Sequence, residues 1–61
     1  MISCNIYLKH RMHPGDGEFL TTMNFSFCPR IGEFIEYTGK EYIVEKVTHT
    51  HVGTILTVSE S

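Results

Sequence analysis

Apolar residues recur at every second position along much of this chain, which is the period of a β-strand with one buried face. The clearest case is residues 2–9, where Ile2, Cys4, Ile6 and Leu8 share one face and polar residues occupy most of the other. Residues 18–27 repeat the alternation with three phenylalanines in phase. The inward set predicted for this segment is Phe19, Thr21, Met23, Phe25 and Phe27. We therefore expect two strands here, the second being the heaviest contributor to the core.

Three further strands are predicted in the second half of the chain, at residues 34–38, 41–50 and 54–59. In the first of these, Ile35 and Tyr37 are expected to point inward, which places Phe34 outside. In the last, the expected inward residues are Leu56 and Val58.

The strand at 41–50 contains a break in the alternation. Tyr42 and Val44 share a phase, but Val47 is out of step by one position. A β-bulge near Glu45–Lys46 would return Val47 to the apolar face, because a bulge adds one residue to one strand of a pair.

Four connections separate these strands. Residues 10–17 contain Pro-Gly-Asp-Gly and predict a long loop, and residues 28–33, with one Pro and one Gly, predict a turn or short irregular segment. The Thr-Gly-Lys sequence at 38–40 is typical of a hairpin tip. Residues 51–53 form the last predicted turn.

The composition agrees with an all-β fold. The chain has no Ala and no Gln, whereas 24 of its 61 residues are Ile, Val, Thr, Phe or Tyr, the types that favour strands over helices. Five short strands in one domain over residues 1–61 close most economically into a small antiparallel barrel, because closure removes exposed strand edges. We therefore expect a single five-stranded antiparallel barrel whose bulky core leaves little room for a ligand cleft.

Two segments also carry a family resemblance. Residues 29–35 read Pro-x-apolar-Gly-acidic-x-apolar, and residues 39–47 read Gly-x-x-Tyr-x-Val-x-x-Val. This pattern resembles the turn-strand-hairpin-strand segment of SH3-like small barrels, which are common in short bacterial and phage open reading frames. The resemblance covers residues 29–58, implies a fold, and transfers no functional residue.

The net charge and the cysteine content limit the ligands and the cellular compartment that we expect for this protein. The net charge is −2, which is the wrong sign for a general DNA-binding protein. No segment has the apolar length of a membrane span, and the N-terminus lacks the layout of a signal peptide. Two cysteines, Cys4 and Cys28, are expected as buried or half-buried thiols in a reducing cytoplasm, with a single disulfide as the minority alternative.

Catalytic motifs are missing from the sequence. It has no nucleophile elbow, phosphate-binding loop or His-Glu-x-x-His, so we expect a non-enzymatic protein with no cofactor and no small-molecule substrate. His49 and His51 share a strand face, and His10 and His13 lie in the first loop. Without a Cys-x-x-Cys or comparable pair, these residues indicate at most a minor metal-binding role.

One local basic cluster supports an alternative function. Lys9, His10, Arg11 and His13 fall within residues 9–13, and Tyr7 on the polar face of the preceding strand could stack on a base. A small nucleic-acid-binding barrel that uses this 9–13 loop is therefore the competing hypothesis.

The favoured function is protein binding through apolar residues that fall on the outward phase, or self-association through an open strand edge. In the fourth strand either Ile43 or Tyr42 points outward, and we assign Tyr42 to the surface. Size and resemblance also suit an accessory protein of a phage or mobile element that acts on a host partner. The predicted contact residues, an aromatic or aliphatic centre with a basic rim, are Tyr7, Leu20, Phe34, Tyr42, Arg11, Arg30 and Lys40.

Overall fold

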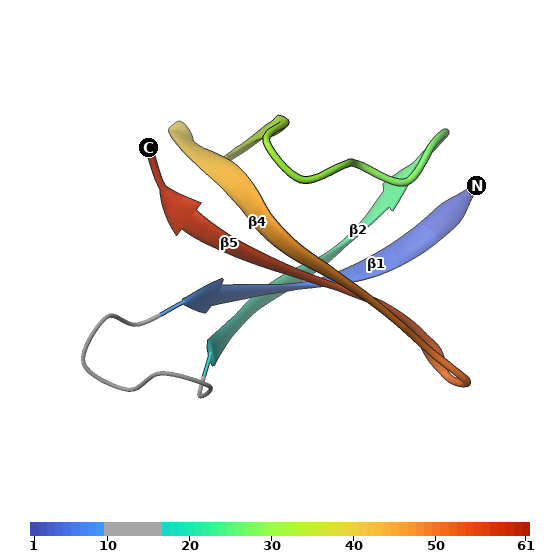
Figure 1. Cartoon of the computed structure of the whole chain (residues 1–61). Coiled ribbons are helices and arrows are strands. Elements are labelled where there is room, and N and C mark those ends of the chain that lie inside the picture. Colours follow the sequence, from blue (N-terminus) through green and yellow to red (C-terminus); the bar gives the residue numbers. More distant parts are fainter. Residues whose placement is uncertain (10–16) are drawn as a thin grey trace.

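The computed structural model describes residues 1–9 and 17–61, which contain five β-strands in a single mixed sheet (Figure 1). The strands are β1 (Ile2–Lys9), β2 (Gly17–Phe25), β3 (Phe34–Tyr37), β4 (Lys40–Thr50) and β5 (Gly53–Glu60). Their order across the sheet is β2-β1-β5-β4-β3. The all-β class and the five strands are thus confirmed. The described residues include no helix of the length and apolar character that crossing a membrane requires.

The sheet departs from the predicted antiparallel barrel at its centre. A β1–β2 hairpin and a β3–β4–β5 meander meet where β1 and β5 pair in parallel, with Cys4 beside Thr54 and Leu8 beside Val58. Alternation of apolar residues is the same in parallel and antiparallel strands, so the sequence pattern does not report the pairing direction.

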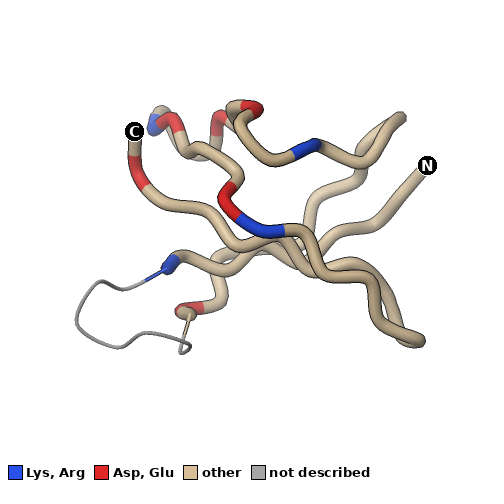
Figure 2. The backbone as a smooth tube through the Cα atoms, in the orientation of Figure 1, with Lys and Arg blue, Asp and Glu red and all other residues tan. Residues whose placement is uncertain are grey.

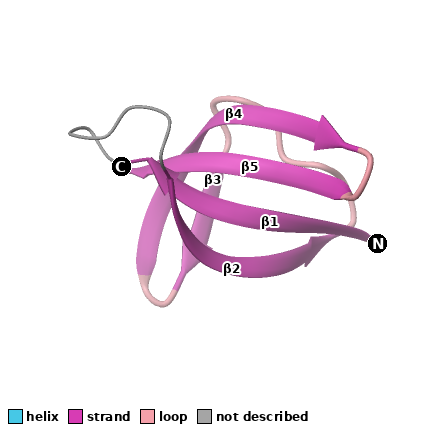
Figure 3. Ribbon diagram, turned by 90° about the horizontal axis from the view of Figure 1, so that it is seen from below, coloured by secondary structure: helices cyan, strands magenta, loops and turns pink. Residues whose placement is uncertain are grey.

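The sheet curls into a half-barrel and does not close (Figure 3). Its two edges are β2 and β3, and within residues 1–9 and 17–61 neither strand has a second partner. Following the pairings across the sheet, β2 and β3 run in opposite directions. Two edges of the described sheet therefore remain open, whereas a closed barrel has none.

The core lies on the concave face of the half-barrel and contains no phenylalanine. Phe25 is only half-buried, and Phe19, Phe27 and Phe34 are exposed. The expectation that the second strand is the heaviest contributor to the core is therefore wrong, because β2 is an edge strand with a neighbour on one side only. The buried residues come mainly from β1, β4 and β5, and they are Cys4, Ile6, Ile35, Tyr42, Val44, Leu56 and Val58.

A register shift in β2 reverses two of the predicted orientations. Ile6 pairs with Thr21, but the next residue, Tyr7, pairs with Phe19, which leaves Leu20 as the extra residue of a bulge. Leu20 therefore packs against the core, contrary to its predicted exposure. Phe19 turns to the outer face, where its ring meets that of Tyr7 edge to face at a centroid distance of 5.4 Å.

The bulge predicted in the fourth strand is confirmed. The β4–β5 register shifts between Val44 and Lys46, and Val47 packs against the core cluster. Tyr42 is in phase with Val44 and is buried, so its assignment to the surface is wrong and the outward position belongs to Ile43.

Two tight turns fix the position of β3. At its end, Thr38 and Gly39 both have positive φ (51° and 79°), as in the type I′ turn of a two-residue hairpin. At its start, the N–H of Glu33 donates to the carbonyl of Arg30 at 3.0 Å, and Gly32 has a φ of 94°. A positive φ at the third of four residues is typical of a type II turn, which suits Gly.

Candidate functional site

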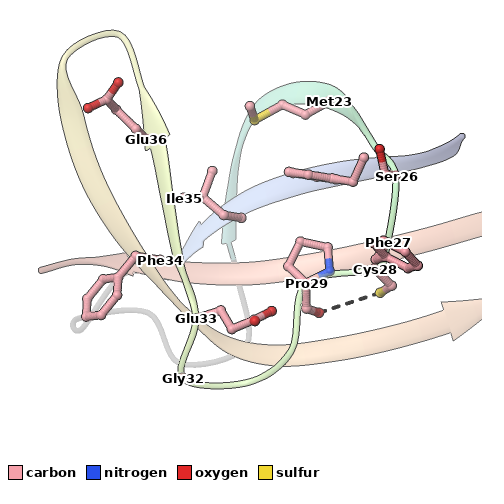
Figure 4. Close-up of a pocket in the computed structure, with 11 residues that line it drawn as sticks. Met23, Ser26, Phe27, Cys28, Pro29, Gly32, Glu33, Phe34, Ile35 and Glu36 are labelled. Atoms are coloured by element: carbon pink, nitrogen blue, oxygen red, sulfur yellow. Dashed lines mark hydrogen bonds between the residues drawn. The ribbon is translucent and has the colours of Figure 1, made fainter.

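An open groove separates the two free edges of the half-barrel (Figure 4). It has a volume of about 790 Å³ and is here called the edge groove. It is lined by Met23 and Phe25 of β2, by Ser26, Phe27, Cys28 and Pro29 of the following connection, and by Gly32, Glu33, Phe34, Ile35 and Glu36. The expectation that the molecule has little room for a cleft is therefore wrong, because the phenylalanines do not fill the interior and the sheet stays open.

The floor of the edge groove is apolar. Ile35 is buried and points into the space between β3 and β2, toward Met23 (Figure 4). Met23, Phe25 and Cys28 are half-buried and pack against the core cluster. The groove is thus the uncovered part of the hydrophobic interior.

Two exposed aromatic rings lie beside the edge groove. Phe27 follows the end of β2 and is 85% exposed, and Phe34 opens β3 and is 58% exposed. Ile35 points into the groove, whereas the Phe34 ring lies on the other face of β3 (Figure 4). Leaving two large apolar side chains in water beside an apolar floor is unfavourable in the isolated chain, and such patches mark contact surfaces.

The turn at residues 30–33, which precedes β3, is held by the carboxylate of Glu33. The backbone N–H of Arg30 donates to Oε1 of Glu33 at 2.6 Å, in addition to the backbone bond that closes this turn. The N–H of Gly32 and the carbonyl of Glu33 both bond to Val44 of β4. The start of β3 is therefore anchored, and one of the two carboxylates of the groove is already engaged.

The outer face of β3 pairs an apolar position with an acidic one. Phe34 lies opposite Ile43 of β4, and Glu36 lies opposite Glu41. Like charges directly opposite one another in an antiparallel pair are destabilising. Figure 2 shows acidic positions gathered around β3 and the start of β4. Two acidic residues, Glu33 and Glu36, therefore border the groove on this side.

Both thiols are free, and Cys28 lines the groove. Cys4 is buried, Cys28 is half-buried, and Sγ of Cys28 donates to the carbonyl of Pro29 at 3.6 Å. Burial raises the pKa of the Cys4 thiol, and the neighbouring Cys28 thiol raises it further through its charge and a hydrogen bond. The expected pair of buried and half-buried thiols is confirmed, and Cys4 is held in its neutral form.

The structure separates the predicted apolar contact residues. Phe34 is exposed, as predicted, and it borders the edge groove. Tyr7 is half-buried on the outer face against Phe19 and does not line the groove. Leu20 and Tyr42 belong to the core side, as described above.

The predicted basic residues are also dispersed. Arg30 is exposed in the turn before β3, and Nζ of Lys40 pairs with Oε1 of Glu60 at 3.4 Å. Lys9, at the start of the 9–13 cluster, pairs with Glu45 at 3.3 Å. Arg11, with the rest of that cluster, lies outside the described residues.

The histidines that the structure describes are exposed at the far end of the β4–β5 hairpin. Nδ1 of His49 lies 3.3 Å from the hydroxyl of Thr54, and His51 occupies the turn. No group of three or more His, Cys, Asp or Glu side chains that could hold a metal ion occurs within residues 1–9 and 17–61. His10 and His13 lie outside the described residues.

Sequence reasoning missed most of the groove. The alternation that predicts an inward Phe27 extends two residues past the end of β2, although Pro29 indicates that regular pairing stops nearby. Glu33 and Glu36 are three positions apart in the sequence, and this spacing does not indicate that they flank an apolar surface.

Comparison with known proteins gives no relative from which a function could be inferred. A functional assignment therefore depends on the groove, the exposed phenylalanines beside it and its acidic residues, and the resemblance to SH3-like barrels stays a prediction. No family model, no curated protein and no solved structure matches the chain.

Proposed function

We propose that this chain is a non-enzymatic protein-interaction module that binds a partner protein at the edge groove. The observation that carries the proposal is the apolar floor of Ile35, Met23 and Phe25 left open between two unpaired strand edges. Phe27, next to the groove, and Phe34, on the outer face of β3, supply the exposed aromatic residues that protein interfaces favour. A partner that covers the free edge of β3 would contact the groove floor on one face of the strand and Phe34 on the other.

Other ligand classes fit the groove less well. Small-molecule sites combine an enclosed apolar pocket with several converging polar groups, whereas this groove is open and the Glu33 carboxylate is already bonded to Arg30. Nucleic acid needs cations, but Glu33 and Glu36 line this surface. In the 9–13 cluster, Lys9 is paired with Glu45.

The biological setting that we propose follows from the family resemblance and the absence of catalytic motifs. The chain would act in the cytoplasm as an accessory protein of a phage or mobile element, with a host protein as its partner. Its work would be to occupy or redirect that partner, since binding alone suffices for this.

Affinity capture with matched surface variants tests the proposal. Phe34→Ser removes a ring beside the edge groove, and Val52→Ser removes another exposed apolar side chain (81% exposed, against 58% for Phe34) at the tip of the β4–β5 hairpin. The purified proteins are immobilised and exposed to lysate of the native host. We expect wild type and Val52→Ser to retain the same protein, and Phe34→Ser to lose it.

Two outcomes contradict the proposal. Equal recovery of the partner by all three proteins would place the contact elsewhere. Recovery that disappears after nuclease treatment, together with micromolar binding of a labelled single strand that a Lys9→Ala, Arg11→Ala variant loses, would favour the nucleic-acid hypothesis.

A further inference from the structure

The free edge of β3 offers a regular set of backbone groups. Val44 N–H bonds to the carbonyl of Glu33, so residue 33 faces β4. Residues of an antiparallel pair face the neighbouring strand alternately, which directs the N–H and C=O of Ile35 and Tyr37 toward β4 as well. The N–H and C=O of Phe34 and Glu36 then point away from β4, toward the open side.

These groups have no backbone partner within residues 1–9 and 17–61. The sheet ends at β3, and none of the hydrogen bonds formed by the connection after β2 involves Phe34 or Glu36. A row of unpaired donors and acceptors on an edge strand is a template for another strand. The edge groove lies directly beside it.

Side chains on the two faces of β3 define what such a strand would contain. On the concave face, Ile35 requires an apolar neighbour that enters the groove. On the outer face, Phe34 with Ile43 favours an aromatic or aliphatic residue, and the opposed carboxylates of Glu36 and Glu41 favour a cation. The added strand should therefore place an aromatic or aliphatic residue opposite Phe34, an apolar residue opposite Ile35 and a Lys or Arg opposite Glu36.

We propose that β3 binds an extended segment of a partner protein as an added antiparallel strand, with a basic residue opposite Glu36 and an apolar side chain in the edge groove. This inference rests on the proposed function and specifies its mode. Backbone hydrogen bonds to Phe34 and Glu36 supply affinity, and the alternating side chains supply specificity. The antiparallel direction is chosen because it is the more stable pairing.

A second copy of this chain is the less suitable occupant. Pairing of β3 with its own symmetry mate would bring Glu33, Glu36 and Glu41 of both copies to one seam. Each chain also carries a net charge of −2. Like charges across an interface oppose association, whereas a basic segment removes the repulsion already present between Glu36 and Glu41.

A short synthetic peptide tests the mode directly. The probe has the sequence Ser-Val-Lys-Ile-Tyr-Val-Ser with blocked ends, so that its Lys faces Glu36, its Ile faces Ile35 and its Tyr faces Phe34. The matched control carries N-methyl groups on the Lys and Tyr amides, which removes two donors and leaves every side chain. A third peptide replaces Lys by Glu.

The expected result has three parts, measured by titration with backbone-amide NMR. The probe binds, and it slows hydrogen exchange at the Phe34 and Glu36 amides. The N-methylated peptide binds at least about tenfold more weakly, because two hydrogen bonds are lost. The Glu peptide is weaker as well, and Glu36→Gln in the protein reduces the difference between the two peptides, whereas the same change at Glu18, at the start of β2, does not.

Three results would overturn the inference. They are absence of probe binding up to about 1 mM, equal binding of the N-methylated peptide, and protection of Phe34 and Glu36 that rises with protein concentration without peptide. The last would identify a second copy as the occupant. The proposed function has a separate test, the affinity capture described above. It fails if Phe34→Ser recovers the native partner as well as Val52→Ser does, whatever the peptides show.

Discussion

Among residues 1–9 and 17–61, Cys4 is a residue whose acid–base chemistry is altered by folding. Its side chain is buried within the core cluster, and both this burial and the neighbouring Cys28 thiol raise its pKa. A buried thiolate would be unfavourable, since burial disfavours the charged form, and a second ionisable thiol beside it adds repulsion. The residue therefore acts in the core as a small apolar side chain.

The raised pKa of Cys4 predicts a loss of stability at alkaline pH. In the unfolded chain the thiol deprotonates near its ordinary pKa of 9.0, but the folded chain resists deprotonation, so its contribution is complete below pH 9.0 and falls as the pH rises above it. Urea unfolding under reducing conditions, followed by circular dichroism between pH 8 and 11, measures this decrease. Cys4→Ala is the control and should lose less stability over that range. Equal slopes for the two proteins would mean that Cys4 does not couple to folding.

At the scale of the element, the hairpin that presents β3 contains a local conflict. Thr38 has a φ of 51°, a left-handed conformation that β-branched residues rarely adopt. Its hydroxyl donates to the carbonyl of Tyr37 at 2.7 Å, which compensates only in part. The chain accepts this strain because the two-residue turn sets the β3–β4 register, and with it the alternation that leaves Phe34 and Glu36 facing outward.

Thr38→Asn is therefore expected to stabilise the protein. Asn-Gly is the preferred type I′ pair, and relief of the strain should raise the free energy of unfolding by on the order of 1 kcal/mol. In a domain of this size that corresponds to roughly 4–8 °C in Tm, which thermal unfolding can measure. Thr38→Val keeps the branch and loses the hydroxyl, so its Tm should not rise. A Thr38→Asn protein no more stable than Thr38→Val would show that the turn is not strained.

The two β-bulges show which features of a strand can be predicted from the sequence and which cannot. The β4 bulge was predictable because Val47 is out of step within one strand, and a single chain segment contains all the information. The β2 bulge was not, because Phe19 and Leu20 are both apolar and either can serve an inward position. A bulge is visible in a sequence only when it changes the polarity of a position.

The candidate site was predictable only at Phe34. Its exposure follows from the local alternation around Ile35, which the structure retains. The edge groove depends on which strands become edges, and that is decided by the parallel pairing of β1 with β5. Such a pairing joins segments about 50 residues apart and leaves no trace in the period of either one.

At the scale of the whole molecule, stability and contact surface lie in different parts of the sheet. The fully buried side chains belong to β1, β4 and β5, whereas the exposed phenylalanines lie on or next to β2 and β3. The molecule therefore folds around its centre and leaves its edges available. Small domains have a low free energy of unfolding, so a costly substitution at the centre of the sheet should unfold the chain, whereas one at an edge should not.

Substitutions at the centre and the edge should differ greatly in cost. Leu56 is 0% exposed in β5, so Leu56→Ala should lose about 2–5 kcal/mol and leave the chain partly unfolded. Phe34→Ser should cost within about 1 kcal/mol, the value of its cross-strand contact with Ile43. Chemical denaturation of both variants gives the comparison. Unfolding of Phe34→Ser would show that this ring belongs to the core and would remove it from the proposed contact surface.

Hydrogen exchange tests the open half-barrel without any substitution. Amides of β1, β5 and β4, which have a neighbouring strand on both sides, should exchange slowest, and protection should fall toward the edge strands β2 and β3. Within β3 the amide of Ile35 should be protected and those of Phe34 and Glu36 should exchange rapidly, because of these three residues only Ile35 faces β4. NMR-detected exchange on the isolated chain at low concentration resolves this alternation. Uniform protection along β3 would mean that its edge is already covered, and a covered edge could not receive the strand of a partner.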